Sequence, residues 1–265
     1  MPDARELAFI RGLLPVGREI GLSALQGEFG IHPGQLEIYI RRLEECGFVF
    51  GLTKETVRIK REPESLIPEL IMAGLKTDRI GREVLVFKET SSTNDRVRQA
   101  GVGEAGEGLV IFAESQTDGR GTHGKKWISS TGAGLWFSIL LRSSIQPDKG
   151  SWLLKMAAIA SAEAIEECLG RPIQIKPPND LYLEGGKLAG FLLETSSAWN
   201  FQVLGIGLNV RSAPAINGYR TAAIDQFAQN RISRNALAAS ILNHFEEWYC
   251  GRSSDEISAA FESRL

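Results

Sequence analysis

The sequence has few cysteines and no long apolar run, and both absences exclude classes of protein. The three cysteines, Cys46, Cys168 and Cys250, are widely separated and form no Cys-x-x-Cys pair. We therefore expect no disulfide framework and a reducing compartment. No stretch reaches the ~18 consecutive apolar residues of a membrane span, and residues 1–6 lack the apolar segment of a signal peptide. We expect a cytoplasmic protein with no membrane partner.

The sequence also lacks an excess of charge and several catalytic motifs. Its 30 Lys and Arg residues face 32 Asp and Glu residues, a net charge of −2, so the whole chain offers no cationic surface to DNA or an anionic membrane. It contains neither a Walker A nor a Gly-x-Ser-x-Gly motif, and its histidines form no zinc-binding pattern with the cysteines. What remains is a globular composition, 43% hydrophobic over 265 residues, which fits one large and one small domain.

Residues 1–65 have the pattern of a small domain of their own. Amphipathic spacing and turn residues predict three helices and then two short strands, over residues 4–13, 23–29, 33–47, 48–50 and 56–60. Ser23 is a candidate cap of the second helix, and Pro33 suits the first turn of the third. Three helices followed by a β-hairpin predict a winged helix-turn-helix domain.

The remainder of the chain alternates strands and helices. Prolines at 63 and 68 mark a break, so we assign residues 66–82 to a linker, although helical stretches also occur there. From residue 83 to 265, strands are predicted over 84–87, 109–113, 135–141, 173–176, 181–183, 187–194 and 201–210. Helices are predicted over 152–168, over 234–249 and from a capping box at Ser253 onward. Adjacent strands without a helix between them predict an α+β fold with a mixed sheet.

A glycine-rich segment, Gly119-Arg-Gly-Thr-His-Gly124, is the first candidate site. It has the Gly-x-Gly-x-x-Gly spacing of dinucleotide sites, but it does not link a strand directly to a helix. Glycines let backbone N–H groups approach an anion, and Arg120, Lys125 and Lys126 would neutralise it. We therefore favour a phosphate-binding loop over a solvated basic loop.

A second candidate lies at Lys176-Pro-Pro-Asn-Asp180. The two prolines end the preceding strand and present Asn179 and Asp180 at a rigid turn. An amide beside a carboxylate suits a metal or a nucleotide hydroxyl, but taken alone the segment is more typical of a capped turn. A two-residue turn at Gly185-Gly186 would return Lys187 to the same place.

Two further segments offer polar groups. Ser91-Ser-Thr-Asn-Asp95 is typical of a helix N-terminus, which also binds polar ligands. In Gly205-Ile-Gly-Leu-Asn209, glycine within a strand indicates a close approach by a ligand or by backbone, with Asn209 as the polar group offered there.

Taken together and in this order, these segments resemble those of the biotin protein ligases. Members of that family carry Ser-Thr-Asn, then Gln ahead of a Gly-Arg-Gly loop and Lys-Trp, which correspond here to Ser92–Asn94, Gln116 and Gly119–Trp127. They then carry Lys-Trp-Pro-Asn-Asp, Lys-x-x-Gly and Gly-x-Gly-x-Asn, which correspond to 176–180, 187–190 and 205–209. The resemblance covers residues 83–260, and an N-terminal winged helix is typical of the ligase/repressor branch.

The resemblance implies a fold, a reaction and partners. The fold is a mixed sheet with flanking helices, related to class II aminoacyl-tRNA synthetases. In the reaction the biotin carboxylate attacks the α-phosphate of MgATP, and a lysine of a biotin carboxyl-carrier protein then attacks the adenylate. Two anions meet in the first step, so positive charge between them is needed.

The resemblance also implies site residues. Lys187, Arg120 and Asp180 would be catalytic, with Lys187 on the biotin carboxylate and transferring phosphate. Asn179 and Asp180 would hold Mg2+. Biotin and ATP would be bound by Ser92, Thr93, Asn94, Gln116, Gly119, Arg120, Gly121, Thr122, Trp127, Lys176, Asn179, Lys187, Gly190 and Asn209.

The sequence departs from the family pattern at several points. Thr122 stands where the family has its second loop arginine, so the adenylate would be less firmly retained. Pro177 replaces a tryptophan beside biotin. The sequence stops at Leu265, where longer members continue into a small β-barrel domain, and we expect that domain to be missing.

Other interpretations stay open. A non-catalytic biotin or adenylate sensor would agree with Thr122, whereas Lys187 and Arg120 favour an enzyme. A lipoate ligase shares the fold, although the Gly-Arg-Gly loop argues against it. Residues 1–65 hold nine Lys and Arg against ten Asp and Glu, which is poor for phosphate contacts. A structural or dimerisation module therefore competes with an operator-binding domain.

Overall fold

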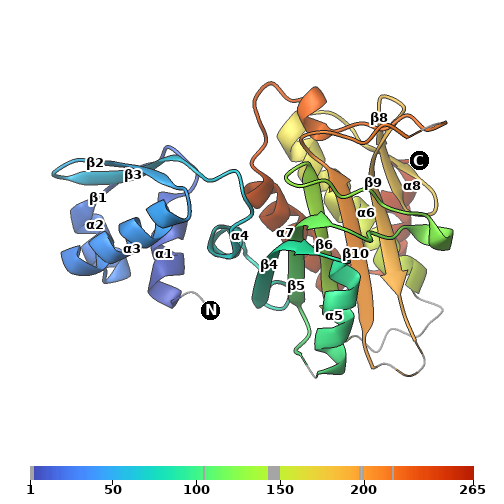
Figure 1. Cartoon of the computed structure of the whole chain (residues 1–265), viewed down its shortest axis with the longest axis horizontal. Helices are drawn as coiled ribbons and strands as arrows, with labels where there is room; N and C mark the ends of the chain where they lie inside the picture. Colours follow the sequence, from blue (N-terminus) through green and yellow to red (C-terminus); the bar gives the residue numbers. More distant parts are fainter. Residues whose placement is uncertain (1–2, 104, 143–149, 197, 199, 217) are drawn as a thin grey trace. The chain divides into compact units, whose positions relative to one another are not determined.

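The computed structural model describes residues 3–103, 105–142, 150–196, 198, 200–216 and 218–265. The chain divides into two compact units, Met1–Gly74 (unit 1) and Leu75–Leu265 (unit 2). Figure 1 shows the elements of each.

Unit 1 consists of helices packed on a small antiparallel sheet with the strand order β1-β3-β2. Its elements are α1 (Ala4–Leu13), β1 (Glu19–Gly21), α2 (Leu22–Phe29), α3 (Pro33–Glu45), β2 (Val49–Leu52) and β3 (Thr56–Arg61). Phe9, Leu25, Leu43 and Ile59 are buried at its centre. The three helices and the hairpin agree with the prediction. Gly21, not Ser23, is the N-cap of α2, because the preceding strand β1, too short for a periodic signal, takes the chain to Gly21.

The segment predicted as a linker, residues 66–82, is folded. Helix α4 (Pro68–Gly74) packs on α1, and Leu70 and Ala73 join the core of unit 1. Pro68 begins this helix, since proline is tolerated in the first helical turn. The next residues belong to unit 2, where the carboxylate of Glu246 accepts backbone N–H groups between residues 78 and 80. The boundary thus lies at Gly74/Leu75.

Unit 2 is built on a mixed seven-stranded sheet with the order β4-β5-β6-β10-β9-β8-β7. Strands β4 and β5 are parallel, and the other neighbouring pairs are antiparallel. The strands are β4 (Glu83–Thr90), β5 (Leu109–Gln116), β6 (Gly134–Leu141), β7 (Gln174–Lys176), β8 (Asp180–Leu183), β9 (Gly186–Glu194) and β10 (Gln202–Asn209). The predicted mixed α+β sheet is confirmed.

Helices cover the sheet on both sides in the view of Figure 1, with α5 (Thr93–Val102) in front and α6 (Gly150–Leu169) and α7 (Arg234–Gly251) behind. Helix α5 packs on β5, β6 and β10, and α6 packs on β7 to β10 and on α7 and α8 (Ser254–Glu262). The described residues of the unit also include the short 3-10 turns η1 (Thr122–Gly124) and η3 (Ile224–Gln226). Among the described residues, no helix combines the length and apolar character that crossing a bilayer requires.

Candidate active site

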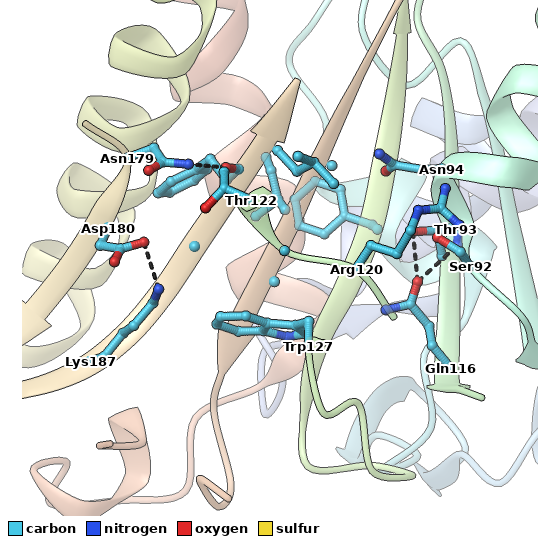
Figure 2. Close-up of a pocket in the computed structure, with 18 residues that line it drawn as sticks. Ser92, Thr93, Asn94, Gln116, Arg120, Thr122, Trp127, Asn179, Asp180 and Lys187 are labelled. Carbon is cyan, nitrogen blue, oxygen red and sulfur yellow. Dashed lines mark hydrogen bonds and ion pairs between the residues drawn. The ribbon is translucent and has the colours of Figure 1, made fainter. Parts of the chain in front are cut away.

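A pocket in unit 2 brings together segments that are far apart in the sequence. It lies between the start of α5, the loop 117–133 that connects β5 to β6 (the β5–β6 loop), and strands β8, β9 and β10 (Figure 2). The predicted site residues that line it are Ser92, Thr93, Asn94, Gln116, Arg120, Gly121, Thr122, Trp127, Asn179, Asp180, Lys187 and Gly190. Gly119, Lys176 and Asn209 do not line it.

The start of α5 is fixed by a side chain from the neighbouring strand. Ser92 is the N-cap by position, but its hydroxyl makes no capping bond. Instead, the Gln116 side-chain oxygen accepts the Thr93 N–H at 2.8 Å and the Thr93 hydroxyl at 3.2 Å. The Gln116 amide in turn donates to the Ser129 hydroxyl at 2.7 Å. Gln116 therefore links α5 to the β5–β6 loop and leaves the Ser92 hydroxyl available to a ligand.

Asn94 is buried beside the pocket and keeps an unused donor. Its side-chain oxygen accepts the Ser138 hydroxyl at 2.5 Å, and a side chain at Gly205 would collide with that oxygen. Its Nδ2 is buried with no hydrogen-bond partner within the described structure. A buried unpaired donor is costly, so this atom marks the place where a ligand acceptor would fit.

The glycine at position 119 serves the packing of the β5–β6 loop. A side chain there would collide with the Trp127 carbonyl and approach the Ser129 hydroxyl to 2.9 Å. Further along, the Gly121 N–H donates to the Lys125 carbonyl at 2.7 Å. These glycines allow the loop to fold back on itself. Packing within the loop therefore explains their spacing, in addition to the predicted approach of an anion to the backbone.

Trp127 lies against two glycines of the sheet. A Cβ atom at Gly207 would be 2.5 Å from the Trp127 ring, and one at Gly190 would be 3.0 Å from it. The predicted close approach to strand β10 is thus made by the side chains of Trp127 and Asn94, and not by backbone. The indole Nε1 is buried without a hydrogen-bond partner among the described atoms, so it is a second donor that a ligand would satisfy.

Arg120 is bound by two carboxylates. Its Nη1 and Nη2 each donate to a different oxygen of Asp95 at 2.9 Å. Its Nη2 and Nε also donate to Glu194, at 3.1 and 3.4 Å. The hydrogen bonds from Arg120 hold the pKa of Asp95 below its usual value, and the two acids raise the pKa of Arg120. The guanidinium is therefore neutralised by protein groups.

Lys187 lies on the opposite side of the pocket, with Trp127 between it and Arg120 (Figure 2). Its ammonium is 2.7 Å from Asp180 and 5.5 Å from the centre of the Trp127 ring. The ladder between β8 and β9 skips Leu188. Such a bulge reverses the alternation of side chains and directs Lys187 to the same face as Gly190. The hairpin is as predicted, but its turn is at Glu184-Gly185, where both residues have positive φ.

Three predicted residues make contacts with other protein groups. Asn209 donates to the carbonyls of Lys187 and Ala222 and so holds the strand that carries Lys187. Lys176 lies 5.1 Å from the Tyr182 ring. Asn179 lines the pocket, but its amide donates to the Phe191 carbonyl.

The pocket is narrow in this state. Its volume is about 50 Å³, against ~300 Å³ or more for typical small-molecule sites. Its two cations are each paired with acids, and Lys187, which has a single carboxylate partner, is the one that can exchange it for an anionic ligand. Widening would come from the β5–β6 loop, which connects two strands and carries exposed residues at 123–126.

Several residues of the site were not predicted. Asp95 entered only as part of a helix N-terminus, and Glu194, Ser129 and Ser138 were absent. Only for Glu194 could the sequence have given a signal. Glu194 lies four residues after Gly190 in the predicted strand, and side chains an even number of residues apart in a strand lie on the same face of the sheet. Ser129 and Ser138 have no sequence signal of their own.

The chain is similar to known proteins over much of its length. Residues 86–210 match the Biotin/lipoate A/B protein ligase family. The chain is 31% identical over 220 residues to the Bifunctional ligase/repressor BirA of Bacillus subtilis, covering 80% of this chain and 67% of that protein. It is 33% identical over 199 residues to the Biotin--[acetyl-CoA-carboxylase] ligase of Mycobacterium tuberculosis, covering 73% and 72% respectively.

Solved structures show the same similarity. The biotin protein ligase of Aquifex aeolicus in complex with biotin and ATP superposes with a TM-score of 0.61 at 26% identity, covering 69% of this chain and 78% of that chain. The Leishmania major biotin protein ligase in complex with biotinyl-5-AMP has a TM-score of 0.64 at 21% identity, with coverage of 69% and 81%, and this match concerns the fold.

Proposed function

The chain belongs to the biotin/lipoate A/B protein ligase family, and we propose that within it the protein acts as an ATP-dependent biotin protein ligase. In the first step a biotin carboxylate oxygen bonds to the α-phosphorus of ATP, and the bond to the β-phosphate breaks, releasing pyrophosphate. In the second step a lysine amine of a carboxyl-carrier protein bonds to the biotin carbonyl carbon. AMP then leaves with the electrons of the anhydride bond.

The observation that carries this proposal is the Lys187 ammonium, which faces a pocket beside unused donors. A reaction between two anions needs positive charge there. Lys187, with one carboxylate partner, can supply it from the side of the pocket opposite Arg120. Asn94 Nδ2 and Trp127 Nε1 are buried without acceptors in the described structure. Biotin supplies acceptors in its ureido and carboxylate oxygens.

Lys187 is the group placed to handle the reacting anions. Its ammonium is bound to one carboxylate, Asp180, and a lysine with a single partner can transfer to a substrate oxygen. In that position it would bring the biotin carboxylate and the α-phosphate together and stabilise the charge that develops on the phosphate oxygens.

MgATP is the proposed nucleotide substrate, and Mg2+ enters with it. Among the described residues, no group of three His, Cys, Asp or Glu side chains is arranged to hold a metal ion. Mg2+ is commonly bound by one or two carboxylates together with substrate phosphates and water. Asp180, a carboxylate that lines the pocket, fits that arrangement. The side-chain oxygen of Asn179 is a neutral oxygen beside it, since only the amide nitrogen is bound to the Phe191 carbonyl.

Unit 1 supports a second activity, because its element order fits a winged helix-turn-helix domain, with α3 as the recognition helix and β2–β3 as the wing. The match to the Bacillus subtilis protein covers 80% of this chain, which exceeds the length of unit 2, Leu75–Leu265, and so extends into unit 1. That relative is named a ligase and repressor. On these grounds we propose operator binding as the role of unit 1, with a salt-dependent gel shift on the protein's own upstream DNA as the test.

One assay tests the ligase function. Radiolabelled biotin and MgATP are incubated with the protein and a biotin carboxyl-carrier domain, and label is measured on the carrier lysine and as free adenylate. We expect label on the carrier with biotin and none with radiolabelled lipoate. Labelled adenylate without transfer would instead indicate a sensor, and transfer of lipoate alone would indicate a lipoate ligase.

A further inference from the structure

The Arg120 guanidinium connects three segments that each supply residues to the pocket. Asp95 directly follows Asn94 in the first turn of α5, Arg120 lies in the β5–β6 loop, and Glu194 is the last residue of β9. Strand β9 is separated from β5 by β6 and β10 in the sheet. The contacts of Arg120 therefore join the β5–β6 loop to α5 and to the end of β9, a strand that is not a neighbour of β5 or β6 in the sheet.

The hydrogen bonds of Arg120 to Asp95 and Glu194 are stronger than hydrogen bonds between neutral groups. The pair with Asp95 is bidentate, with both bonds at 2.9 Å, and such charge-assisted bonds are roughly twice as strong as neutral ones. Glu194 adds a second carboxylate at 3.1 Å. The three side chains are part-buried, with 31%, 19% and 22% exposure for Arg120, Asp95 and Glu194, so solvent screens them incompletely.

Near its tip, the β5–β6 loop is attached to neighbouring elements by Arg120, by the packing of Trp127 on β9 and β10, and by the Lys125 ammonium, which lies 5.5 Å from the centre of the Tyr219 ring. Its own hydrogen bonds, such as Gly121 to Lys125 and Trp127 to Gly119, are internal and keep its shape without fixing its position. Residues 123–126 are exposed. The Arg120 contacts are thus the ion pairs that join the loop to α5 and β9, beside the packing of Trp127 on Gly190 and Gly207.

We propose that Asp95 and Glu194 are positioning residues which, through Arg120, hold the β5–β6 loop closed over the pocket. This inference rests on the proposed function for the identity of the retained ligand, biotin. The two acids set how readily the loop opens, and thereby how tightly biotin is kept, whereas the chemical step depends on Lys187.

The first test measures the loop without any ligand. Trypsin cleaves after Lys125 and Lys126, which are exposed at the loop tip, and cleavage requires local opening of the chain. We expect Asp95→Asn and Glu194→Gln each to increase the rate of cleavage there about tenfold, the change that corresponds to ~1.4 kcal/mol. The double variant should be less than additive, because both acids act on one guanidinium.

Arg98→Gln is the matched control. Arg98 binds Asp95 at 2.7 Å but takes no part in the Arg120 contacts, so its loss should leave the cleavage rate unchanged. If Arg98→Gln accelerates cleavage as much as Asp95→Asn does, or if neither acid variant accelerates it while circular dichroism shows a native fold, the proposal is wrong.

The second test separates positioning from chemistry. We expect the two acid variants to raise KM for biotin about tenfold, with kcat for adenylate formation changing less than twofold. A fall in kcat with unchanged KM would overturn the positioning role. If the unaltered protein neither binds nor activates biotin, the proposed function fails, while the trypsin result still decides whether the acids hold the loop.

Discussion

The two cations of the pocket are held in different ways. Arg120 donates to two carboxylates through three of its nitrogens. Lys187 has one carboxylate, Asp180, at 2.7 Å and the face of Trp127 at 5.5 Å. A planar guanidinium bound in two directions is slow to exchange its partners, whereas an ammonium on a flexible chain with one partner exchanges readily. The comparison indicates a structural role for the first and a chemical role for the second.

The largest effect that this comparison predicts comes from Lys187→Ala. Loss of a group that stabilises developing charge typically lowers kcat by about 10²–10³-fold, and we expect adenylate formation, measured as pyrophosphate release, to fall by that factor. Lys155→Ala is the matched control, because the Lys155 ammonium also lies on a tryptophan, 4.7 Å from the ring of Trp152, but outside the pocket. A Lys187→Ala protein with normal pyrophosphate release would refute the chemical role.

An intermediate effect is expected from Asp180→Asn. The change removes the acid partner of Lys187 and the proposed carboxylate for Mg2+, so the Mg2+ concentration for half-maximal activity should rise about tenfold, one lost charge-assisted contact being worth ~1.5 kcal/mol. A Mg2+ titration of pyrophosphate release measures this. Asp225→Asn breaks a similar ion pair, to Arg211 at 2.8 Å, away from the pocket, and it should leave the requirement unchanged. If Asp180→Asn needs the same Mg2+ concentration for half-maximal activity as the unaltered protein, Asp180 does not bind the metal.

The smallest effect concerns the pH dependence of the Arg120 contacts. Arg120 lowers the pKa of Asp95 from its ordinary value of 3.8. A lowered folded-state pKa means that the stabilisation is complete above the unfolded-state value and is lost as the pH falls through the folded-state value. Urea unfolding should show wild type more stable than Asp95→Asn by about 1 kcal/mol at pH 7.

The same difference should shrink as the pH falls below 3.8, where Asp95 is protonated in the unfolded chain, toward the lower pKa at which it is protonated in the folded protein. A stability difference that is equal at pH 7 and pH 3 would mean that Asp95 acts through packing and not through its charge on Arg120.

Much of the fold follows from the sequence because its signals are local. The apolar runs of β5 and β6, the capping box at Ser253 and the helix beginning near Pro33 each lie within a few residues. The same is true of the segments that line the pocket, since each carries its own pattern of glycine and polar residues.

What the sequence did not reveal depends on contacts between distant segments. Nothing near Glu194 indicates Arg120, 74 positions away, and nothing near Gly205 indicates that it makes room for Asn94. Likewise, the direction of Lys187 depends on a bulge whose only trace is the register of β8 against β9. These features arise from packing, which a pattern along one segment does not contain.

Helix α4 has a practical consequence for anyone who wishes to produce the N-terminal part alone. A truncation after residue 65 would remove Leu70 and Ala73 from the interior and deprive the Arg11 side chain of the Ala73 carbonyl to which it donates at 3.1 Å. The shortened product would expose an apolar surface along its first helix and would tend to precipitate. A fragment that ends at Gly74 retains α4 and keeps that apolar surface covered.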